Sequence, residues 1–202
     1  MDVLTDIDLV RAVAPRLTPA SLRAADAADD GYLGTLDVRF SVFNNWYEID
    51  SFFEGRFLER IAPGAFRKTM KESRDGIKVL YDHGMDFHVG NKVLGPIREL
   101  GEDDDAAYGI VPLFDTSYNR DLLPGLREGV YGSSFRFRVV KDEWNDDPGT
   151  SRHNPQGIAE RTIKEVRLFE FGPVTFPANP AATAGMRSMT DEFYERLRAR
   201  NP

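Results

Sequence analysis

Residues 169–180 read Phe-Glu-Phe-Gly-Pro-Val-Thr-Phe-Pro-Ala-Asn-Pro, and this stretch says most about how the chain folds. It is an apolar, strand-like run that carries one carboxylate, Glu170, and closes in a turn with two prolines. A carboxylate in such a run is costly to bury unless another group pairs with it. The stretch therefore predicts a strand whose glutamate has a polar partner elsewhere in the fold.

Two earlier segments offer natural partners for that carboxylate. Residues 79–84 read Val-Leu-Tyr-Asp-His-Gly, and residues 131–137 read Tyr-Gly-Ser-Ser-Phe-Arg-Phe. Each places one reactive type of side chain, a histidine or a serine, in an otherwise strand-like run. A serine, a histidine and a carboxylate on three separate strands are the ingredients of nucleophilic catalysis.

The composition sets limits on fold and function. A chain of 202 residues with 41% apolar and 11% aromatic residues suits one domain with a real core, extended at its termini. A net charge of −7 argues against nucleic acid as a direct partner. The absence of cysteine excludes a thiol nucleophile, disulfides and thiolate metal sites. No apolar run approaches membrane-spanning length, and the acidic N-terminus lacks a signal-peptide pattern.

The order of apolar and polar residues predicts many short strands and a few helices without regular βαβ alternation, which is a β-rich α+β domain. We expect a peripheral helical extension over residues 1–32, a main domain over 33–188 and a C-terminal helix over 189–202. Within the main domain we expect strands near 33–43, 77–82 and 134–139, a helix over 117–128 that ends at Gly129, and a loop over 143–157.

Five groups of motifs occur in one order over residues 34–188. They read SVFN (41–44), FLERIAPGAF (57–66), VLYDHG (79–84) with VLGPIREL (93–100), GVYGSSFRFRV (129–139) and IKEVRLFEFGPVTFPANPAA (163–182). Together they resemble the prohead proteases of tailed phages, the serine peptidases that mature procapsids. The resemblance implies a β-barrel flanked by a few helices, similar to the herpesvirus capsid-maturation proteases.

The same resemblance implies roles for three residues. Ser134 stands at the serine of the family pattern S-F-G-F, where Arg136 replaces the usual small residue, and would be the nucleophile. His83 would be the general base, because a neutral imidazole accepts the serine proton. Glu170 stands at the glutamate of the pattern L-x-E-V-S-x-V-x-x-P-A-x-P and would orient the histidine. The residues that follow it, Phe-Gly-Pro, depart from the pattern.

Several alternatives accompany these assignments. Ser133 competes with Ser134, although it should share the core-facing pleat of Phe135 and Phe137. Glu165 is the second candidate for the carboxylate. Arg136 and Arg138 share the pleat of Ser134, so they either lie near the developing oxyanion or form a solvated strand face.

The remaining histidines favour no metal site. His88 follows His83 by five residues, which is not a recognised ligand spacing, and no nearby carboxylate pattern supports a metal. His153 lies in the polar loop, so we expect neither a metal nor another cofactor.

The function implied is that of a serine endopeptidase that cleaves phage capsid or scaffolding protein, and itself, during procapsid maturation. The implied partners are the major capsid protein with its scaffolding segment and further copies of this chain, and the implied location is the assembling procapsid in the host cytoplasm, away from membranes. One alternative is a non-catalytic structural or scaffolding protein on the same barrel. Another is an esterase, although no G-x-S-x-G elbow surrounds Ser134.

Overall fold

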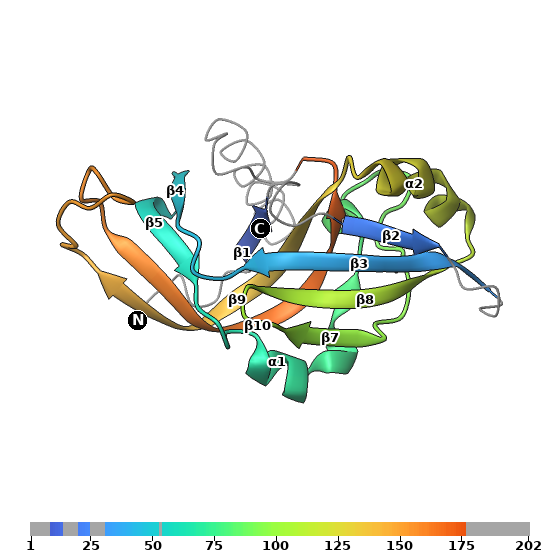
Figure 1. Cartoon of the computed structure of the whole chain (residues 1–202), viewed down its shortest axis with the longest axis horizontal. Coiled ribbons are helices and arrows are strands. Elements are labelled where there is room, and N and C mark those ends of the chain that lie inside the picture. The colour runs from blue at the N-terminus through green and yellow to red at the C-terminus, as the bar shows by residue number, and fades with distance from the viewer. Residues whose placement is uncertain (1–8, 14–19, 25–30, 53, 177–202) are drawn as a thin grey trace, which may run out of the picture.

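Two sheets make up most of the computed structural model, which describes residues 9–13, 20–24, 31–52 and 54–176 (Figure 1). The larger sheet runs in the order β1 (Leu9–Val13), β9 (Gly132–Asn145), β10 (Glu160–Val174), β5 (Gly55–Ile61) and β4 (Tyr47–Ser51), and β6 (Lys78–Val79) also pairs with β10. The smaller sheet runs β2 (Ala20–Ala24), β3 (Tyr32–Val42), β8 (Ala106–Phe114) and β7 (Glu99–Glu102). The helical elements within the described residues are α1 (Arg67–Glu72), α2 (Ser117–Glu128) and two 3₁₀ turns, η2 (Arg74–Gly76) and η3 (Asp82–Gly84).

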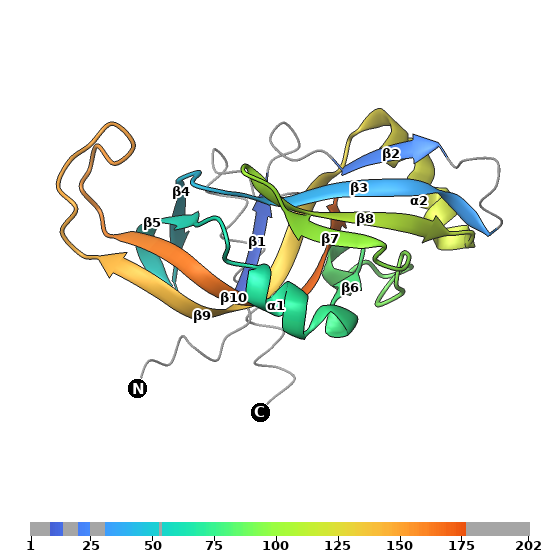
Figure 2. The same cartoon turned by 60° about the horizontal axis from the view of Figure 1, so that its bottom comes forward.

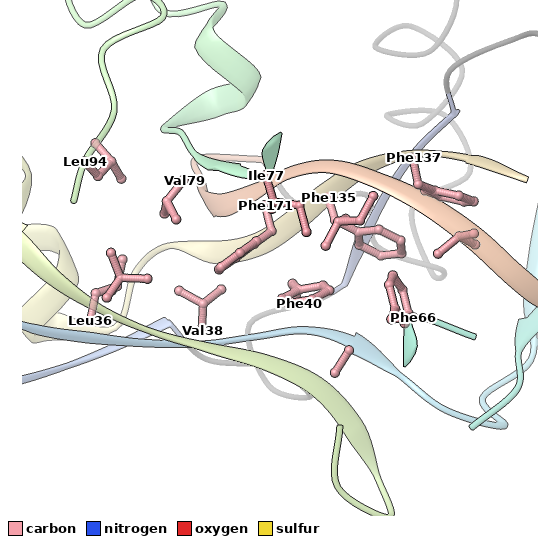
Figure 3. Packing of buried hydrophobic residues seen from close by; sticks show 14 of the residues in the cluster. Leu36, Val38, Phe40, Phe66, Ile77, Val79, Leu94, Phe135, Phe137 and Phe171 are labelled. Atoms are coloured by element: carbon pink, nitrogen blue, oxygen red, sulfur yellow. The ribbon is translucent and has the colours of Figure 1, made fainter. Parts of the chain in front are cut away.

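The two sheets face each other across an aromatic core. Phe40 on β3 stacks on Phe171 of β10 with ring centroids 4.6 Å apart, and Phe66 meets both Phe40 and Phe135 edge-on at 5.5 Å. Figure 3 shows these rings, with Phe137, lying between the ribbons of the opposed strands. Burial of this aromatic surface is the main force that holds the sheets together.

Strand β9 has the two-faced character expected from its sequence. Phe135, Phe137 and Val139 are buried in the core, whereas Arg136 between them is partly exposed. Because successive side chains of a strand point to opposite faces, Ser134 shares the outer face with Arg136.

A bulge in β10 decides which way Glu170 points. Val166 and Leu168 are buried in the core, so strict alternation would turn the residue at 170 toward the core as well. The pairing with β9 shifts register between Leu168 and Glu170, after which Phe171 is the residue that enters the core. Bulges re-aim side chains in this way, and this one turns Glu170 to the outer face, opposite Arg136.

Gly172 allows another segment to cross that outer face closely. It lies opposite Ser134 in the β9–β10 register, and a Cβ built at this position would come within 1.9 Å of the Leu80 carbonyl oxygen. The Leu80 N–H donates to the Phe171 carbonyl at 3.1 Å. The chain from Leu80 to η3 therefore lies directly on the outer face of β10, on the side that carries Glu170 and Ser134.

The β-rich α+β prediction is confirmed, but the barrel is not closed. The described strands belong to two separate sheets, because the outer strands β1 and β4 of one and β2 and β7 of the other pair with a single neighbour each. The predicted helix that ends at Gly129 is confirmed as α2, and Gly129 has the left-handed φ of 65° typical of a C-terminal cap. The strand predicted over 77–82 is reduced to β6, because the chain turns into η3.

The prediction of helix in residues 1–32 is wrong for residues 9–13 and 20–24, which form β1 and β2. β1 pairs with β9 and β2 pairs with β3, each in antiparallel fashion. The open edges of β9 and β3 offer backbone partners, and this pairing outweighs the local preference of these residues for a helix. The predicted C-terminal helix at 189–202 lies outside the described residues, and none of the described helices is long and apolar enough to span a membrane.

The close approach at Gly172 generates a stability prediction. Gly172→Ala should lower the free energy of unfolding by about 1–3 kcal/mol, because the added methyl group meets backbone that has no flexible end to move aside. Chemical denaturation measures the change. Gly76→Ala is the matched control, since nothing lies within 4 Å of a Cβ there. Equal stabilities of the two variants would contradict the close crossing.

Candidate active site

His83 and Glu170 form a buried pair. The His83 Nδ1 atom lies 2.7 Å from Glu170 Oε1, and the two side chains are only 3% and 2% exposed. A carboxylate at Nδ1 fixes the orientation of the ring and leaves Nε2 as the nitrogen that can exchange a proton with another group. Glu165, the other candidate carboxylate, instead pairs with Lys68 at 2.9 Å on the surface.

The turn η3 holds His83 in an uncommon backbone conformation. Asp82 and His83 have φ angles of 44° and 58°, a left-handed region that residues other than glycine seldom adopt. Such conformations persist only where the surrounding contacts hold them, and they gather at functional sites.

Asp82 and Tyr81 supply those contacts. The Asp82 carboxylate accepts hydrogen bonds from the backbone N–H of Thr175 at 2.9 Å and from its hydroxyl at 3.1 Å. Tyr81 also shares a hydrogen bond with the Thr175 hydroxyl. Burial raises the pKa of Tyr81 to about 12, so its hydroxyl keeps its proton at neutral pH. These bonds tie η3 to the end of β10 and so position the His83 ring.

Ser134 lies on the face of β9 that the His83–Glu170 pair also occupies. It is opposite Gly172, and its strand neighbour two residues on, Arg136, is opposite Glu170. Ser134 is fully buried, and its Oγ donates a hydrogen bond to the backbone carbonyl of Arg11 in β1 at 2.9 Å. The histidine and the carboxylate are thus in contact, and the serine lies on the neighbouring strand with its hydroxyl bonded to β1.

Ser133 faces the core, as predicted from the pleat. Its Oγ donates to the carbonyl of Arg39 at 2.8 Å, and Arg39 belongs to β3 of the opposite sheet. This side chain joins the two sheets and points away from the face on which His83 and Glu170 meet.

Arg136 brings a positive charge to the buried pair. Its Nε lies 3.8 Å from Glu170 Oε1, beyond hydrogen-bonding distance. Among the described residues, neither Arg136 Nε nor Glu170 Oε2 has a hydrogen-bond partner. The guanidinium thus balances part of the Glu170 charge. A hydrogen-bond donor, Arg136 Nε, and an acceptor, Glu170 Oε2, lie near His83 without a hydrogen-bond partner among the described residues. Arg138 instead lies over the Phe169 ring at 5.8 Å.

The other histidines lie in different surroundings. His153 Nε2 is 2.9 Å from Glu160 Oε1, and its ring stacks on Trp46 at 5.0 Å. The backbone N–H of His88 donates to Asp86. In the described part of the chain, no group of three or more potential ligand side chains is arranged to hold a metal ion.

Sequence reasoning missed four residues that shape this site. Asp82 and Thr175 anchor η3, and Gly172 leaves room for the chain that leads to it. The backbone carbonyl of Arg11 accepts a hydrogen bond from the serine hydroxyl. Asp82 and Gly172 each lie within two residues of a predicted site residue, so their positions carried a usable signal. Arg11 is 123 residues from Ser134, and no local pattern links them.

Comparisons with known proteins bear on the family and on the fold of the chain. The family model of the caudovirus prohead serine proteases matches residues 20–195. Among solved structures, the bacteriophage T4 capsid assembly protease, gp21, is similar in fold, with a TM-score of 0.53 at 12% sequence identity over 84% of this chain and 98% of that chain. None of the curated proteins compared with the chain matches it. Since the family model covers most of its length, the chain belongs to the caudovirus prohead serine proteases, a family of capsid-maturation peptidases.

Proposed function

We propose that this chain is a serine endopeptidase of procapsid maturation in which Ser134 is the nucleophile, His83 the general base and Glu170 the residue that orients His83. The single observation that carries the proposal is the buried His83–Glu170 pair on the face of β9 and β10 that also bears Ser134. A histidine with a buried carboxylate at one nitrogen is the arrangement that activates a serine hydroxyl.

The proposed roles of these three residues define the reaction. Ser134 Oγ attacks the carbonyl carbon of a peptide bond while its proton passes to His83 Nε2. The tetrahedral intermediate collapses as the imidazolium gives that proton to the departing amine, and an acyl-enzyme ester remains. Water then attacks the ester by the same route, with His83 first accepting and then returning a proton, so that Ser134 is regenerated.

Burial of the His83–Glu170 pair strengthens the electrostatic effect of Glu170 on His83. The imidazolium that forms during attack lies next to a carboxylate from which water is largely excluded, and charges interact more strongly there than in water. Glu170 also accepts a hydrogen bond from the Nδ1–H of His83, which fixes the ring so that its Nε2 is the nitrogen presented to the serine. Arg136, on the same outer face, supplies a cation from which the developing oxyanion could also benefit.

The substrates proposed are phage structural proteins, above all the scaffolding part of the major capsid protein, together with other copies of this chain. The proposal rests on the family assignment, and the similar T4 protein is named for capsid assembly. Work of this kind takes place in the assembling procapsid inside the host cytoplasm. Self-association of the chain belongs to the same proposal.

One observation favours the alternative of a non-catalytic scaffolding protein. Ser134 is fully buried, and its hydroxyl is bonded to the Arg11 carbonyl. A serine that only joined β9 to β1 would look the same in the structure. Removal of the Ser134 hydroxyl distinguishes a protease from a scaffolding protein. If the serine is only structural, its loss lowers the stability of the fold and changes nothing else.

Ser134→Ala should abolish proteolysis and leave the fold intact. Loss of the nucleophile removes the covalent route and should lower the rate by roughly 10³-fold or more. The measurement is processing of the cognate capsid protein on coexpression, followed on gels. Ser133→Ala is the control, since that hydroxyl bonds Arg39 in the core and should affect stability alone. Normal processing by the Ser134→Ala chain would rule out the assignment.

Glu170→Gln should reduce turnover by roughly 10²- to 10⁴-fold without unfolding the chain. The amide fills the same space but cannot stabilise the imidazolium. The loss should be milder than that of Ser134→Ala, because nucleophile and base remain. Glu165→Gln is the matched control and should process normally, since its carboxylate pairs with Lys68 on the surface. An inactive Glu165→Gln chain beside an active Glu170→Gln chain would reverse the assignment.

A further inference from the structure

The strand β1 covers the edge of β9 at the proposed nucleophile. β9 pairs with β10 on one side and with β1 on the other, and β1 is the last of the described strands at that edge of the sheet. In the antiparallel β1–β9 register, Arg11 lies opposite Phe135 and Ala12 lies opposite Ser134. Figure 2 shows β1 beside β9, on the side that faces the β4–β5 hairpin. A five-residue segment near the chain start therefore occupies the edge from which a peptide would reach Ser134.

The side chain of Arg11 anchors β1 in a buried acidic site. Its Nη2 lies 2.8 Å from Glu54 Oε1 and its Nε lies 2.5 Å from Glu59 Oε1. The side chains of Arg11, Glu54 and Glu59 are 5%, 3% and 0% exposed. Glu59 also accepts a hydrogen bond from Tyr47 at 2.7 Å and one from Arg161 at 3.2 Å. We call Glu54 and Glu59 the acidic site.

The acidic site needs the cation that β1 brings. Arg161 is shared between Glu59 and Asp142, so among the described residues three carboxylates meet two guanidinium groups while Arg11 is in place. Without Arg11, Glu54 would lose its guanidinium contact and Glu59 would keep Arg161, which it shares with Asp142. Burial raises the pKa of Glu59, but Arg11 and Arg161 outweigh it and hold that pKa below its usual value. An uncompensated buried charge is strongly unfavourable, so a strand that replaces β1 must carry a cation at the same position.

Ser134 cannot act on a substrate while β1 is bound in this way. The hydroxyl is fully buried and donates to the Arg11 carbonyl at 2.9 Å. A nucleophile has to reach the carbonyl of the peptide it cleaves, and here the carbonyl that Ser134 Oγ contacts belongs to β1. The backbone of β1 thus stands where the backbone of an extended substrate would stand.

We propose that the β9 edge beside Ser134 is the peptide-binding site of this protease, that β1 fills it as a built-in pseudosubstrate, and that it takes extended peptides with arginine or lysine at the position of Arg11. The substrate adds a strand to the sheet, so main-chain hydrogen bonds supply affinity and the acidic site supplies selectivity. This inference rests on the proposed function. It adds the class of peptide that the protease accepts and the way in which β1 keeps the protease inactive.

β1 and a substrate peptide compete for the same edge of β9. A tethered strand acts at an effective concentration on the order of millimolar, so a dilute free peptide displaces it poorly. Weakening the anchor of β1 should therefore open the site to peptides added in solution.

The test measures binding in chains that cannot cleave. A fluorescent peptide of residues 6–14, DIDLVRAVA, is titrated into the full-length Ser134→Ala chain and into the same chain carrying Arg11→Glu or Arg11→Ala. The glutamate is repelled by the acidic site and the alanine leaves it empty. Fluorescence anisotropy should show at least tenfold tighter binding to both Arg11 variants. Arg120→Glu is the control, because Arg120 pairs with Asp115 on the surface and should change nothing.

Two further measurements complete the test. A peptide with glutamate in place of the arginine should bind at least tenfold more weakly to the Arg11→Ala chain. An excess of the arginine peptide should speed hydrogen exchange of the β1 amides in the chain that keeps Arg11, a readout that needs no folded Arg11 variant. Equal affinity of all chains, equal affinity for both peptides, or unchanged exchange would overturn the inference.

The outcomes for binding and for catalysis are independent. If the peptide binds as expected but the Ser134→Ala chain still processes capsid protein, the proposed nucleophile is wrong and the peptide site stands. If the Ser134→Ala chain is inactive but the peptide shows no dependence on Arg11, the peptide site is wrong and the proposed function stands.

Discussion

A carboxylate buried in the middle of a long strand is the constraint on which the rest of this structure depends. Glu170 is 2% exposed at the side chain, and burial without a partner would be prohibitive for an ionised group. The partner comes from η3, which has to pass directly over β10 to bring His83 within 2.7 Å. Gly172 makes room for that crossing, and Asp82 and Thr175 keep the turn in place.

Strands β9 and β10 bury apolar side chains in the core on one face and carry the polar residues of the candidate site on the other. The bulge before Glu170 separates the two uses, because Phe171 enters the aromatic core while Glu170 points outward. On β9 the division needs no bulge, since strict alternation turns Phe135 inward and Ser134 outward. The polar residues of the outer face are therefore held by backbone that the core makes rigid, which suits groups that must keep a fixed geometry.

Local patterns in the sequence sufficed for some features. The alternation of Phe135 and Phe137 predicted β9, Gly129 predicted the end of α2, and the single carboxylate in residues 169–171 predicted a buried partner. They could not reveal that β1 pairs with β9, because that pairing depends on an edge formed more than a hundred residues later. The anchoring of Arg11 by Glu54 and Glu59 depends on the same long-range assembly.

The measurement that tests the account most directly is labelling with a fluorophosphonate probe, followed by mass-spectrometric mapping of the modified residue. The probe reacts only with an activated serine. In a chain whose β1 is released by Arg11→Ala, so that the probe can reach the buried hydroxyl, we expect one adduct, on Ser134. The adduct should disappear when His83 is also replaced by alanine, because an unassisted hydroxyl is a poor nucleophile. An adduct on Ser133 or any other serine, or labelling of Ser134 that persists without His83, would contradict the account.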